Sequence, residues 1–301
     1  MRVVMTGATG LIGSALVSLL ESTGYQVTPL RRGPCDDSTI PSWNPLNGDL
    51  SDHAVDGVDA VVHLAGENIA GGRWTKARKA RIRDSRVDGT RHLSEALARL
   101  ERPPKTLIVA SAVGFYGDRG EERVHEQSSA GTGFLPEMCQ AWEAAAEPAV
   151  SRRIRVVQLR LGIVLTPAGG ALGQMLLPFK LGLGGVLGSG QQYMSWVALD
   201  DVLTSVLHAL RTESLTGPVN VVAPAAVTNK EFTKTLGRVL RRPTIFPVPG
   251  FVARILFGEM ADALLLASTY VEPTRLQGSG FVFGYPTLEQ ALEHVLDRRQ
   301  C

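Results

Sequence analysis

Three glycines near the start of the chain, Gly7, Gly10 and Gly13, constrain its fold more than any other feature. They follow a short apolar run at residues 1–5, which is suited to a buried strand, and precede residues 11–20, whose apolar side chains have helical spacing. The glycines therefore fall on a turn between a strand and a helix. There they permit a tight turn, close approach of the backbone to a pyrophosphate, and packing of the helix on the strand. The segment predicts a dinucleotide-binding turn; the alternative is a glycine-rich turn that binds nothing.

Apolar runs and helical patterns alternate along the chain. Further strands are expected at residues 26–30, 58–65, 106–111 and 155–161, and helices at 75–100 and 136–149. Such alternation is typical of βαβ units in a parallel sheet with helices on both faces. We therefore predict an α/β fold, a doubly wound parallel sheet of the Rossmann type with a smaller C-terminal α+β lobe.

The expected Rossmann domain covers residues 1–165, and the chain returns to it at about 195–225. Residues 166–194 and 226–301 are expected to form the substrate-side lobe. Glycine clusters at 169–170 and 184–185 predict loops in the first of these segments.

Composition excludes several classes of protein. The net charge of +2 gives no reason to propose nucleic acid or a membrane as a partner, and no run approaches about 20 apolar residues. Cys35, Cys139 and Cys301 follow no disulfide or metal-ligand spacing, which favours a reduced, cytoplasmic setting. The histidines have no metal-ligand spacing either, so no metal is predicted. The sequence does not determine the oligomeric state, and a homodimer is compatible with it.

A basic stretch runs from Arg73 to Arg91 and holds eight Lys or Arg against two Asp. It could be a nucleic-acid patch. A solvated helix face explains it without a further partner, and we prefer that interpretation.

Two arginines, Arg31 and Arg32, directly follow the second expected strand. In a Rossmann fold an acid at this place binds the ribose of NAD, whereas arginine accommodates the 2′-phosphate of NADP. Asp36 and Asp37 could serve as the acid, but they lie beyond a Gly-Pro turn. The alternative is that the two arginines only lie in solvent at the end of a strand and bind no phosphate. We predict NADP as the cofactor.

The chain resembles the extended and atypical short-chain dehydrogenase/reductase superfamily, also called the NAD-dependent epimerase/dehydratase family. The resemblance rests on Thr6 to Gly13, on His63-Leu64-Ala65-Gly66 and on Ser111 to Gly117. More narrowly, the chain resembles the YfcH-like epimerase family, through Leu64 to Ile69, Trp142-Glu143 and Met175 to Gly185. The resemblance runs from Met1 to about Leu292.

The resemblance implies a set of cofactor contacts. The pyrophosphate would be held by Gly7, Thr9, Gly10, Leu11 and Ile12, with Gly13 completing the turn. The adenosine phosphate would be bound by Arg31 and Arg32, and the ribose side would be lined by Leu64 and Ala65. Arg86 would face the cofactor, and Val164 would lie near the nicotinamide carboxamide.

The superfamily's reaction centre is a Ser or Thr together with a Tyr-x-x-x-Lys helix, in which lysine lowers the pKa of the tyrosine. Ser111, at the end of an expected strand, is suited to be that hydroxyl. Tyr116 is followed four residues later by Gly120 instead of lysine. On the helix that normally carries the pair, the expected positions are about Leu135 and Cys139. The reaction centre is therefore incomplete.

Single side chains near the expected crevice have structural alternatives. Tyr116 either donates a hydrogen bond to a substrate carbonyl or simply packs. Cys139 is either a reactive thiol or a buried inert one, and we prefer the second. His63 next to apolar residues is more typical of a structural hydrogen-bonding group.

Two functions follow. The first is an NADP-dependent oxidoreductase, or an enzyme like the nucleoside-sugar epimerases, acting on an unknown small carbonyl or hydroxyl substrate. Hydride would pass between the nicotinamide and the substrate, with Ser111 and Tyr116 as the catalytic residues that orient its oxygen. The alternative is a non-catalytic NADP(H)-binding regulatory protein that lacks the Tyr-x-x-x-Lys pair.

Overall fold

The computed structural model describes residues 1–33, 41–51 and 55–297. Within them, six parallel strands form a central sheet in the order β12-β8-β6-β5-β1-β2. These strands are β1 (Arg2–Thr6), β2 (Gln26–Pro29), β5 (Ala60–His63), β6 (Thr106–Ala112), β8 (Arg155–Leu161) and β12 (Gly217–Val221). The predicted Rossmann-type α/β fold is confirmed.

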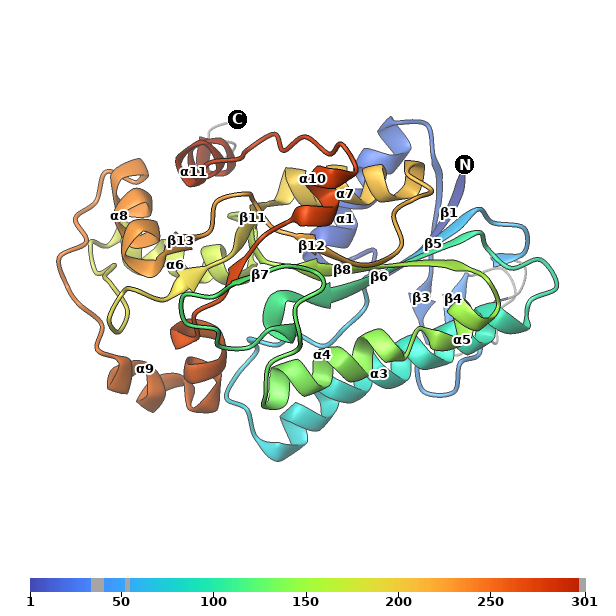
Figure 1. Cartoon of the computed structure of the whole chain (residues 1–301), viewed down its shortest axis with the longest axis horizontal. Helices are drawn as coiled ribbons and strands as arrows, with labels where there is room; N and C mark the ends of the chain where they lie inside the picture. The colour runs from blue at the N-terminus through green and yellow to red at the C-terminus, as the bar shows by residue number, and fades with distance from the viewer. Residues whose placement is uncertain (34–40, 52–54, 298–301) are drawn as a thin grey trace.

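Helices cover both faces of this sheet (Figure 1). One face carries α3 (Lys76–Arg99), α4 (Phe134–Ala144) and α5 (Glu147–Ser151), and the other α1 (Leu11–Ser22), α7 (Leu199–Arg211) and α10 (Thr274–Gly278). Each face of the sheet has its own hydrophobic core. Successive residues of β1 pack into one core and then the other, because side chains alternate between the two faces of a strand. Val3 and Met5 pack in the α1 and α7 core, and Val4 packs in the core on the other face.

The strand order places a switch point between β1 and β5. From β1 the chain passes to β2 on one side of β1, and the later strands of this sheet, β5, β6, β8 and β12, lie on the other side of β1. Ligands of open α/β sheets bind outside the carboxyl ends of the strands at such a point. Here those ends are Thr6 and His63, which are paired in register. The crevice is therefore expected beside the glycine turn.

The remaining elements surround the carboxyl edge of the sheet. Short strand pairs are β3 (Arg31–Arg32) with β4 (Ser42–Trp43), β9 (Ile163–Leu165) with β11 (Trp196–Ala198), β10 (Tyr193–Met194) with β13 (Val227–Thr228), and β7 (Arg123–Val124) with β14 (Tyr270–Val271). The helices are α6 (Gly170–Lys180), α8 (Asn229–Val239), α9 (Gly250–Phe257) and α11 (Leu288–Asp297), with short turns at Val113–Phe115 (η1) and Ala261–Leu266 (η2).

A separate core joins α6, α8 and α11. Leu172, Phe232 and Leu292 belong to it. Leu276 and Phe281, however, pack in the core of the central sheet. The C-terminal segment thus contacts both parts, and the division of the chain into two domains stays a prediction.

The structure differs from the prediction in two segments. The loop predicted at 184–185 is present, but residues 170–180 form helix α6, which was not predicted. Leu172, Leu176 and Phe179 give this helix a buried face that the neighbouring glycines obscure in the sequence. The helix predicted at 136–149 is two helices, α4 and α5. Pro148 has no N–H to continue the hydrogen bonds of α4, so it stands instead in the first turn of a new helix.

Helix α3 carries the basic stretch, and many of its charges have partners within the protein. Lys79 pairs with Glu259, Arg91 with Asp88, and the guanidinium of Arg78 donates to the backbone oxygen of Asn68. Its lysines and arginines also make it too polar for a bilayer. In the described part of the chain, no helix combines the length and apolar character that a membrane span requires.

Candidate active site

The glycine turn packs directly on the loop that follows β5. Gly7 has a φ of +72°, and a Cβ there would lie 2.7 Å from the backbone nitrogen of Ala65 and 2.7 Å from the carbonyl carbon of Leu64. A Cβ on Gly13 would lie 2.1 Å from the carbonyl oxygen of Gly7. Neither glycine tolerates a side chain. The turn therefore joins the ends of β1 and β5, where the cofactor contacts are predicted.

Helix α1 begins at this turn without a side-chain cap. Its N-cap is Gly10, which has no side chain to accept hydrogen bonds from the first-turn N–H groups. Thr9 and Gly10 are exposed, and Leu11 and Ile12 are half-buried. The first N–H groups of a helix have no intrahelical acceptor, and the helix dipole is positive there. The residues present therefore fit a pyrophosphate.

The start of α6 lies over the same turn. A Cβ on Gly169 would lie 3.3 Å from Cδ1 of Leu11, and one on Gly170 would lie 3.9 Å from the carbonyl oxygen of Val164. Val164 is half-buried on β9, paired with Val197 of β11. The structure thus brings Leu11 and Val164, predicted for different parts of one cofactor, to the same side of the sheet.

Arg31 and Arg32 form strand β3, which continues beyond the end of β2. They pair with Ser42 and Trp43 of β4, and both arginine side chains are exposed. Their guanidinium groups are thus open to an anion from solvent. Asp36 and Asp37, the alternative ribose partners, lie outside the described residues, as do Cys35 and Cys301.

Arg86 lies under the loop that follows β5. Its Nη1 donates to the backbone oxygens of Glu67 and Ile82, at 2.9 and 3.2 Å, and its guanidinium lies over the ring of Trp142. A Cβ on Gly66 would lie 3.4 Å from its Cζ. Arg86 therefore supports the backbone next to Leu64 and Ala65.

His63 ends β5 in a fully buried position. Its Nδ1 is 2.6 Å from the hydroxyl oxygen of Thr6, and its Nε2 has no hydrogen-bond partner among the described residues. Burial lowers the pKa of His63 to about 4. The neutral imidazole therefore serves as a hydrogen-bonding group inside the sheet.

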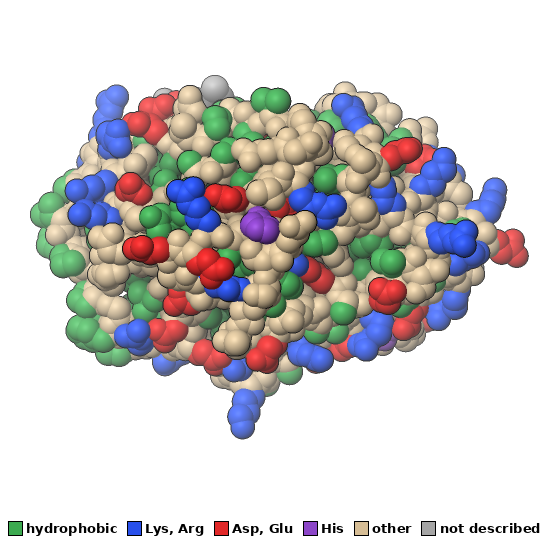
Figure 2. Space-filling model, viewed as in Figure 1, with side chains coloured by type: hydrophobic (Ala, Val, Ile, Leu, Met, Phe, Trp, Pro, Cys, Tyr) green, Lys and Arg blue, Asp and Glu red, His purple; other side chains and the backbone are tan. Residues whose placement is uncertain are grey.

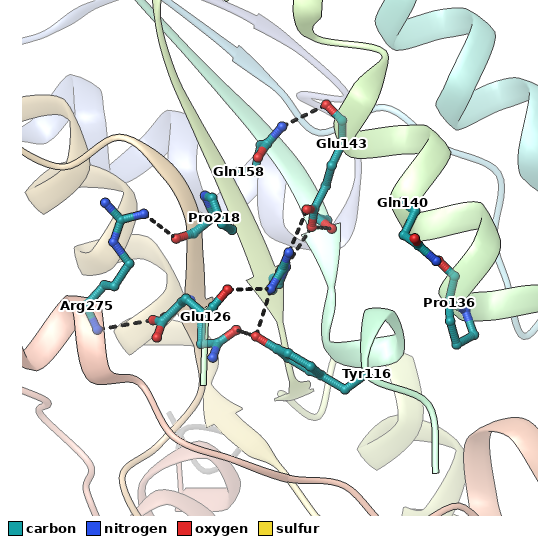
Figure 3. A network of polar contacts seen from close by, with 11 residues as sticks. Tyr116, Glu126, Pro136, Gln140, Glu143, Gln158, Pro218 and Arg275 are labelled. Atoms are coloured by element: carbon teal, nitrogen blue, oxygen red, sulfur yellow. Dashed lines mark hydrogen bonds and ion pairs between the residues drawn. The ribbon is translucent and has the colours of Figure 1, made fainter. Parts of the chain in front are cut away.

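Ser111 is held by a buried ion pair. Its hydroxyl donates to Oε1 of Glu143 over 2.7 Å. Arg160 contacts the same carboxylate twice, from Nε to Oε1 at 2.7 Å and from Nη2 to Oε2 at 2.8 Å. The two charged side chains are only 4% and 11% exposed, for Arg160 and Glu143 respectively. Glu143 comes from α4 and Arg160 from β8, so the pair joins the helix to the sheet (Figure 3).

Tyr116 lies on the other side of Arg160. Its hydroxyl accepts from Nη1 of Arg160 over 2.9 Å and donates to Oδ1 of Asn220 over 2.7 Å. The side chain is completely buried, and burial raises the pKa of Tyr116. The phenol is therefore protonated at neutral pH. The one hydroxyl hydrogen of Tyr116 is thus used, so donating it to a substrate would require the bond to Asn220 to break.

The network continues to the molecular surface. Oε1 of Glu126 accepts from the backbone N–H groups of Asn220 and Arg275, at 3.0 and 3.1 Å, and Oε2 accepts from the hydroxyl of Thr274. Figure 3 shows Glu126 between Tyr116 and Arg275. Beyond it lies a surface hollow of about 520 Å³ lined by His125, Glu126, Gln127, Pro218, Thr274 and Arg275.

The positions expected for Tyr and Lys on α4 hold buried apolar groups. Leu135 is 5% exposed and Cys139 is not exposed. A Cβ on Gly114 of η1 would lie 3.5 Å from Leu135 Cβ and 3.9 Å from Cys139 Sγ. Burial raises the pKa of Cys139 to about 12, so its thiol is neutral. This part of α4 packs on η1.

The sequence alone predicts no role for Glu143, Arg160, Glu126 or Asn220. A signal was present for one of them: Arg160 stands among apolar residues in a strand predicted for a parallel sheet with helices on both faces, and buried arginines are rare unless paired. The partner could not be identified, because it comes from a helix packed against that strand.

A Rossmann-type sheet with a glycine turn at its switch point defines the class of dinucleotide-binding α/β proteins. Residues 3–222 match the family described as NAD dependent epimerase/dehydratase. The chain belongs to that family. Residues 248–295 also match a domain of unknown function, DUF1731.

The chain is similar to named members of this family. It is 45% identical over 297 residues to an epimerase family protein of Mycobacterium bovis, covering 98% of both chains. It is 37% identical to the Homo sapiens epimerase family protein SDR39U1, covering 98% of this chain and 100% of that one. A crystal structure of that human protein with NADPH matches with a TM-score of 0.89 at 34% identity, over 99% of each chain. A nucleoside-diphosphate sugar epimerase from Corynebacterium glutamicum matches with a TM-score of 0.80 at 34% identity, over 98% of this chain and 58% of that one.

Proposed function

We propose that the protein binds NADP(H) at the glycine turn and acts as an oxidoreductase or epimerase-like enzyme on a small hydroxyl or carbonyl substrate. The uncapped start of α1 and the exposed Arg31 and Arg32 support the choice of cofactor, since they offer N–H donors to a pyrophosphate and guanidinium groups to a 2′-phosphate. The similar human protein bound to NADPH supports it as well. We also assign the chain to the narrower YfcH-like branch, on its sequence motifs.

The hydrogen bond from Ser111 to Glu143 carries the catalytic part of the proposal. Ser111 is the penultimate residue of β6, near the carboxyl edge of the sheet, and Glu143 fixes the direction of its hydroxyl hydrogen. A serine hydroxyl has one hydrogen and two acceptor lone pairs. With the hydrogen directed to Glu143, the oxygen of Ser111 is left as an acceptor. It therefore suits a substrate group that donates, such as an alcohol to be oxidised.

Bound NADP(H) would supply or take up the hydride. The protein's own groups orient the substrate oxygen at Ser111 and hold the Glu143 carboxylate in place. Arg160 does the latter, because its guanidinium contacts both carboxylate oxygens. In this proposal Tyr116 acts through Arg160, as a positioning residue, since its hydroxyl already has both a donor and an acceptor partner.

A second function, a non-catalytic NADP(H)-binding regulatory protein, is favoured by one observation. Leu135 and Cys139 stand where the superfamily carries its tyrosine and lysine, and both are buried. Neither side chain can lower the pKa of a catalytic phenol. In such a protein, occupancy by the cofactor would control a partner instead of a reaction.

Calorimetric titration with NADPH and NADH, followed by a turnover screen, separates the two functions. The screen offers NADPH with carbonyl compounds, and NADP⁺ with alcohols and nucleotide sugars. We expect tighter binding of NADPH, and turnover that Ser111→Ala lowers at unchanged NADPH affinity. The matched control is Ser22→Ala, an exposed serine on α1 that bonds only its own helix. NADPH binding without turnover in any panel member would favour the regulatory protein, and absence of NADPH binding would contradict both.

A further inference from the structure

Most of the exposed large hydrophobic side chains lie in one region of the protein. Among the described residues thirteen are exposed, and nine of these lie between residues 177 and 257. Ile245 is 72% exposed, Ile255 66% and Phe251 62%. Single exposed apolar residues are ordinary, but a gathered set marks an interaction surface. We call these nine residues the apolar tip: Leu177, Leu181, Leu183, Ile245, Phe246, Phe251, Ile255, Leu256 and Phe257.

The apolar tip is continuous across three segments. The end of α6 lies against the segment that joins α8 to α9, since a Cβ on Gly182 would lie 3.7 Å from Pro243. The backbone of Val248 then bonds to Val186 and Gly188, and α9 begins two residues later. Figure 1 places α9 and the joining segment at the outer end of the molecule, and Figure 2 shows hydrophobic side chains gathered on that rounded end.

Basic residues accompany the apolar tip. Residues 170–190 and 229–257 hold seven Lys or Arg and a single acid, Glu231, whereas acids outnumber Lys and Arg over the rest of the chain. All seven side chains are exposed. Two of them pair with acids from neighbouring segments, Arg238 with Glu289 and Arg254 with Asp262. The seven are Lys180, Lys230, Lys234, Arg238, Arg241, Arg242 and Arg254.

The basic residues favour one kind of binding partner for this surface over another. A second copy in a two-fold dimer would bring the same basic residues of both chains together, which like-charge repulsion disfavours. A negatively charged partner gains from the same residues. Phe, Leu and Ile side chains that project beside Lys and Arg match the boundary between acyl chains and anionic headgroups.

We propose that the apolar tip docks the protein on an anionic phospholipid surface. Its hydrophobic side chains enter the boundary of the bilayer, and Lys180 and Arg242 contact the lipid phosphates. The net charge of +2 for the whole chain conceals this asymmetry, which is why composition alone gave no reason to expect a membrane partner. The docking is peripheral.

Flotation of the whole protein with lipid vesicles tests the proposal. We expect binding to vesicles of phosphatidylcholine mixed with phosphatidylglycerol, at least about tenfold weaker binding to phosphatidylcholine alone, and weakening by salt. Phe251→Ser with Ile255→Ser should reduce binding about tenfold or more, because serine lacks the apolar surface that Phe and Ile move from water into the bilayer. Lys180→Gln with Arg242→Gln should reduce it to a similar extent.

The matched control is Leu46→Ser with Val282→Ser. These side chains are each 84% exposed and lie outside the apolar tip, so binding should not change. Absence of binding to the mixed vesicles overturns the proposal, and so does an equal loss in the control. Light scattering supplies a further test: a dimer that the Phe251 and Ile255 substitutions dissociate would assign the surface to a second copy and overturn it.

Discussion

The guanidinium of Arg160 holds the carboxylate of Glu143 at two points inside the protein, at 2.7 and 2.8 Å. The pair links the two residues predicted to be catalytic, since Ser111 bonds to Glu143 and Tyr116 bonds to Arg160. Taking two charges out of water is costly, and a buried pair offsets that cost only while both partners remain. The network therefore depends on each of these charges.

The effects of removing the two charges of this pair on the free energy of unfolding should not be additive. We expect Glu143→Gln and Arg160→Gln each to lower the free energy of unfolding by about 3 kcal/mol, because each leaves an unpaired buried charge. The double variant should lose less than the two single losses together, by about 1–3 kcal/mol. Urea unfolding of the four proteins measures this coupling. The exposed pair of Arg254 and Asp262 is the control, with an expected coupling below about 1 kcal/mol. Additive losses at Glu143 and Arg160 would contradict the prediction.

The hydroxyl of Tyr116 should matter for stability. Tyr116→Phe leaves Oδ1 of Asn220 and Nη1 of Arg160 each without one buried partner, so we expect a loss of about 1–3 kcal/mol in unfolding free energy. Affinity for NADPH should not change. Tyr25→Phe is the control, because the hydroxyl of Tyr25 meets Arg211 at an exposed site. A variant that unfolds like the wild type but loses turnover would instead place the phenol at the substrate.

Local sequence was sufficient for five strands of the central sheet and for the glycine turn. The sixth strand, β12, was not predicted, since the sequence indicated only that the chain returns to the Rossmann domain at about 195–225. Strand β8 has the bounds predicted for it, Arg155–Leu161, because an apolar run between a helix and a glycine has few other conformations. The glycine turn was predictable because its constraints act between near neighbours. The side chains that surround Ser111 could not be predicted from local sequence. Glu143 and Arg160 are 17 residues apart and meet only because α4 packs on the sheet. Which contacts a polar residue makes depends on that packing, which the spacing of residues in the chain does not specify.

Acid should destabilise the protein through His63. In the unfolded chain this imidazole takes up a proton near pH 6.5, whereas burial lowers the pKa to about 4 in the folded protein. Between these values the unfolded state binds more protons, so the free energy of unfolding falls as the pH is lowered. The slope rises towards 1.36 kcal/mol per pH unit as the unfolded imidazole becomes fully protonated, so the loss from pH 6.5 to 5 is about 1.5 kcal/mol. Urea unfolding at both pH values, for the wild type and His63→Asn, measures it. An unchanged pH dependence in the variant would refute this role.

The thiol of Cys139 should be protected from reagents. It is fully buried, and burial raises the pKa to about 12, so almost no thiolate is present at neutral pH. In a Cys35→Ser, Cys301→Ser background, a disulfide reagent should therefore react with Cys139 only after urea unfolds the protein. Absorbance of the released thiolate follows the reaction. Rapid labelling of the folded background variant would make Cys139 a reactive thiol instead.

Selectivity for NADPH over NADH should depend on the arginines of β3. Both side chains are exposed, and a guanidinium gains a charge-assisted hydrogen bond only when the 2′-phosphate is present. We expect Arg31→Ala with Arg32→Ala to weaken NADPH binding about tenfold or more and to leave NADH binding nearly unchanged. Arg81→Ala with Arg83→Ala, two exposed positions on α3, is the matched control and should retain the wild-type preference. Calorimetric titration of the three proteins with both nucleotides gives the ratios. If the β3 variant still preferred NADPH by the wild-type margin, the 2′-phosphate would have to be bound elsewhere.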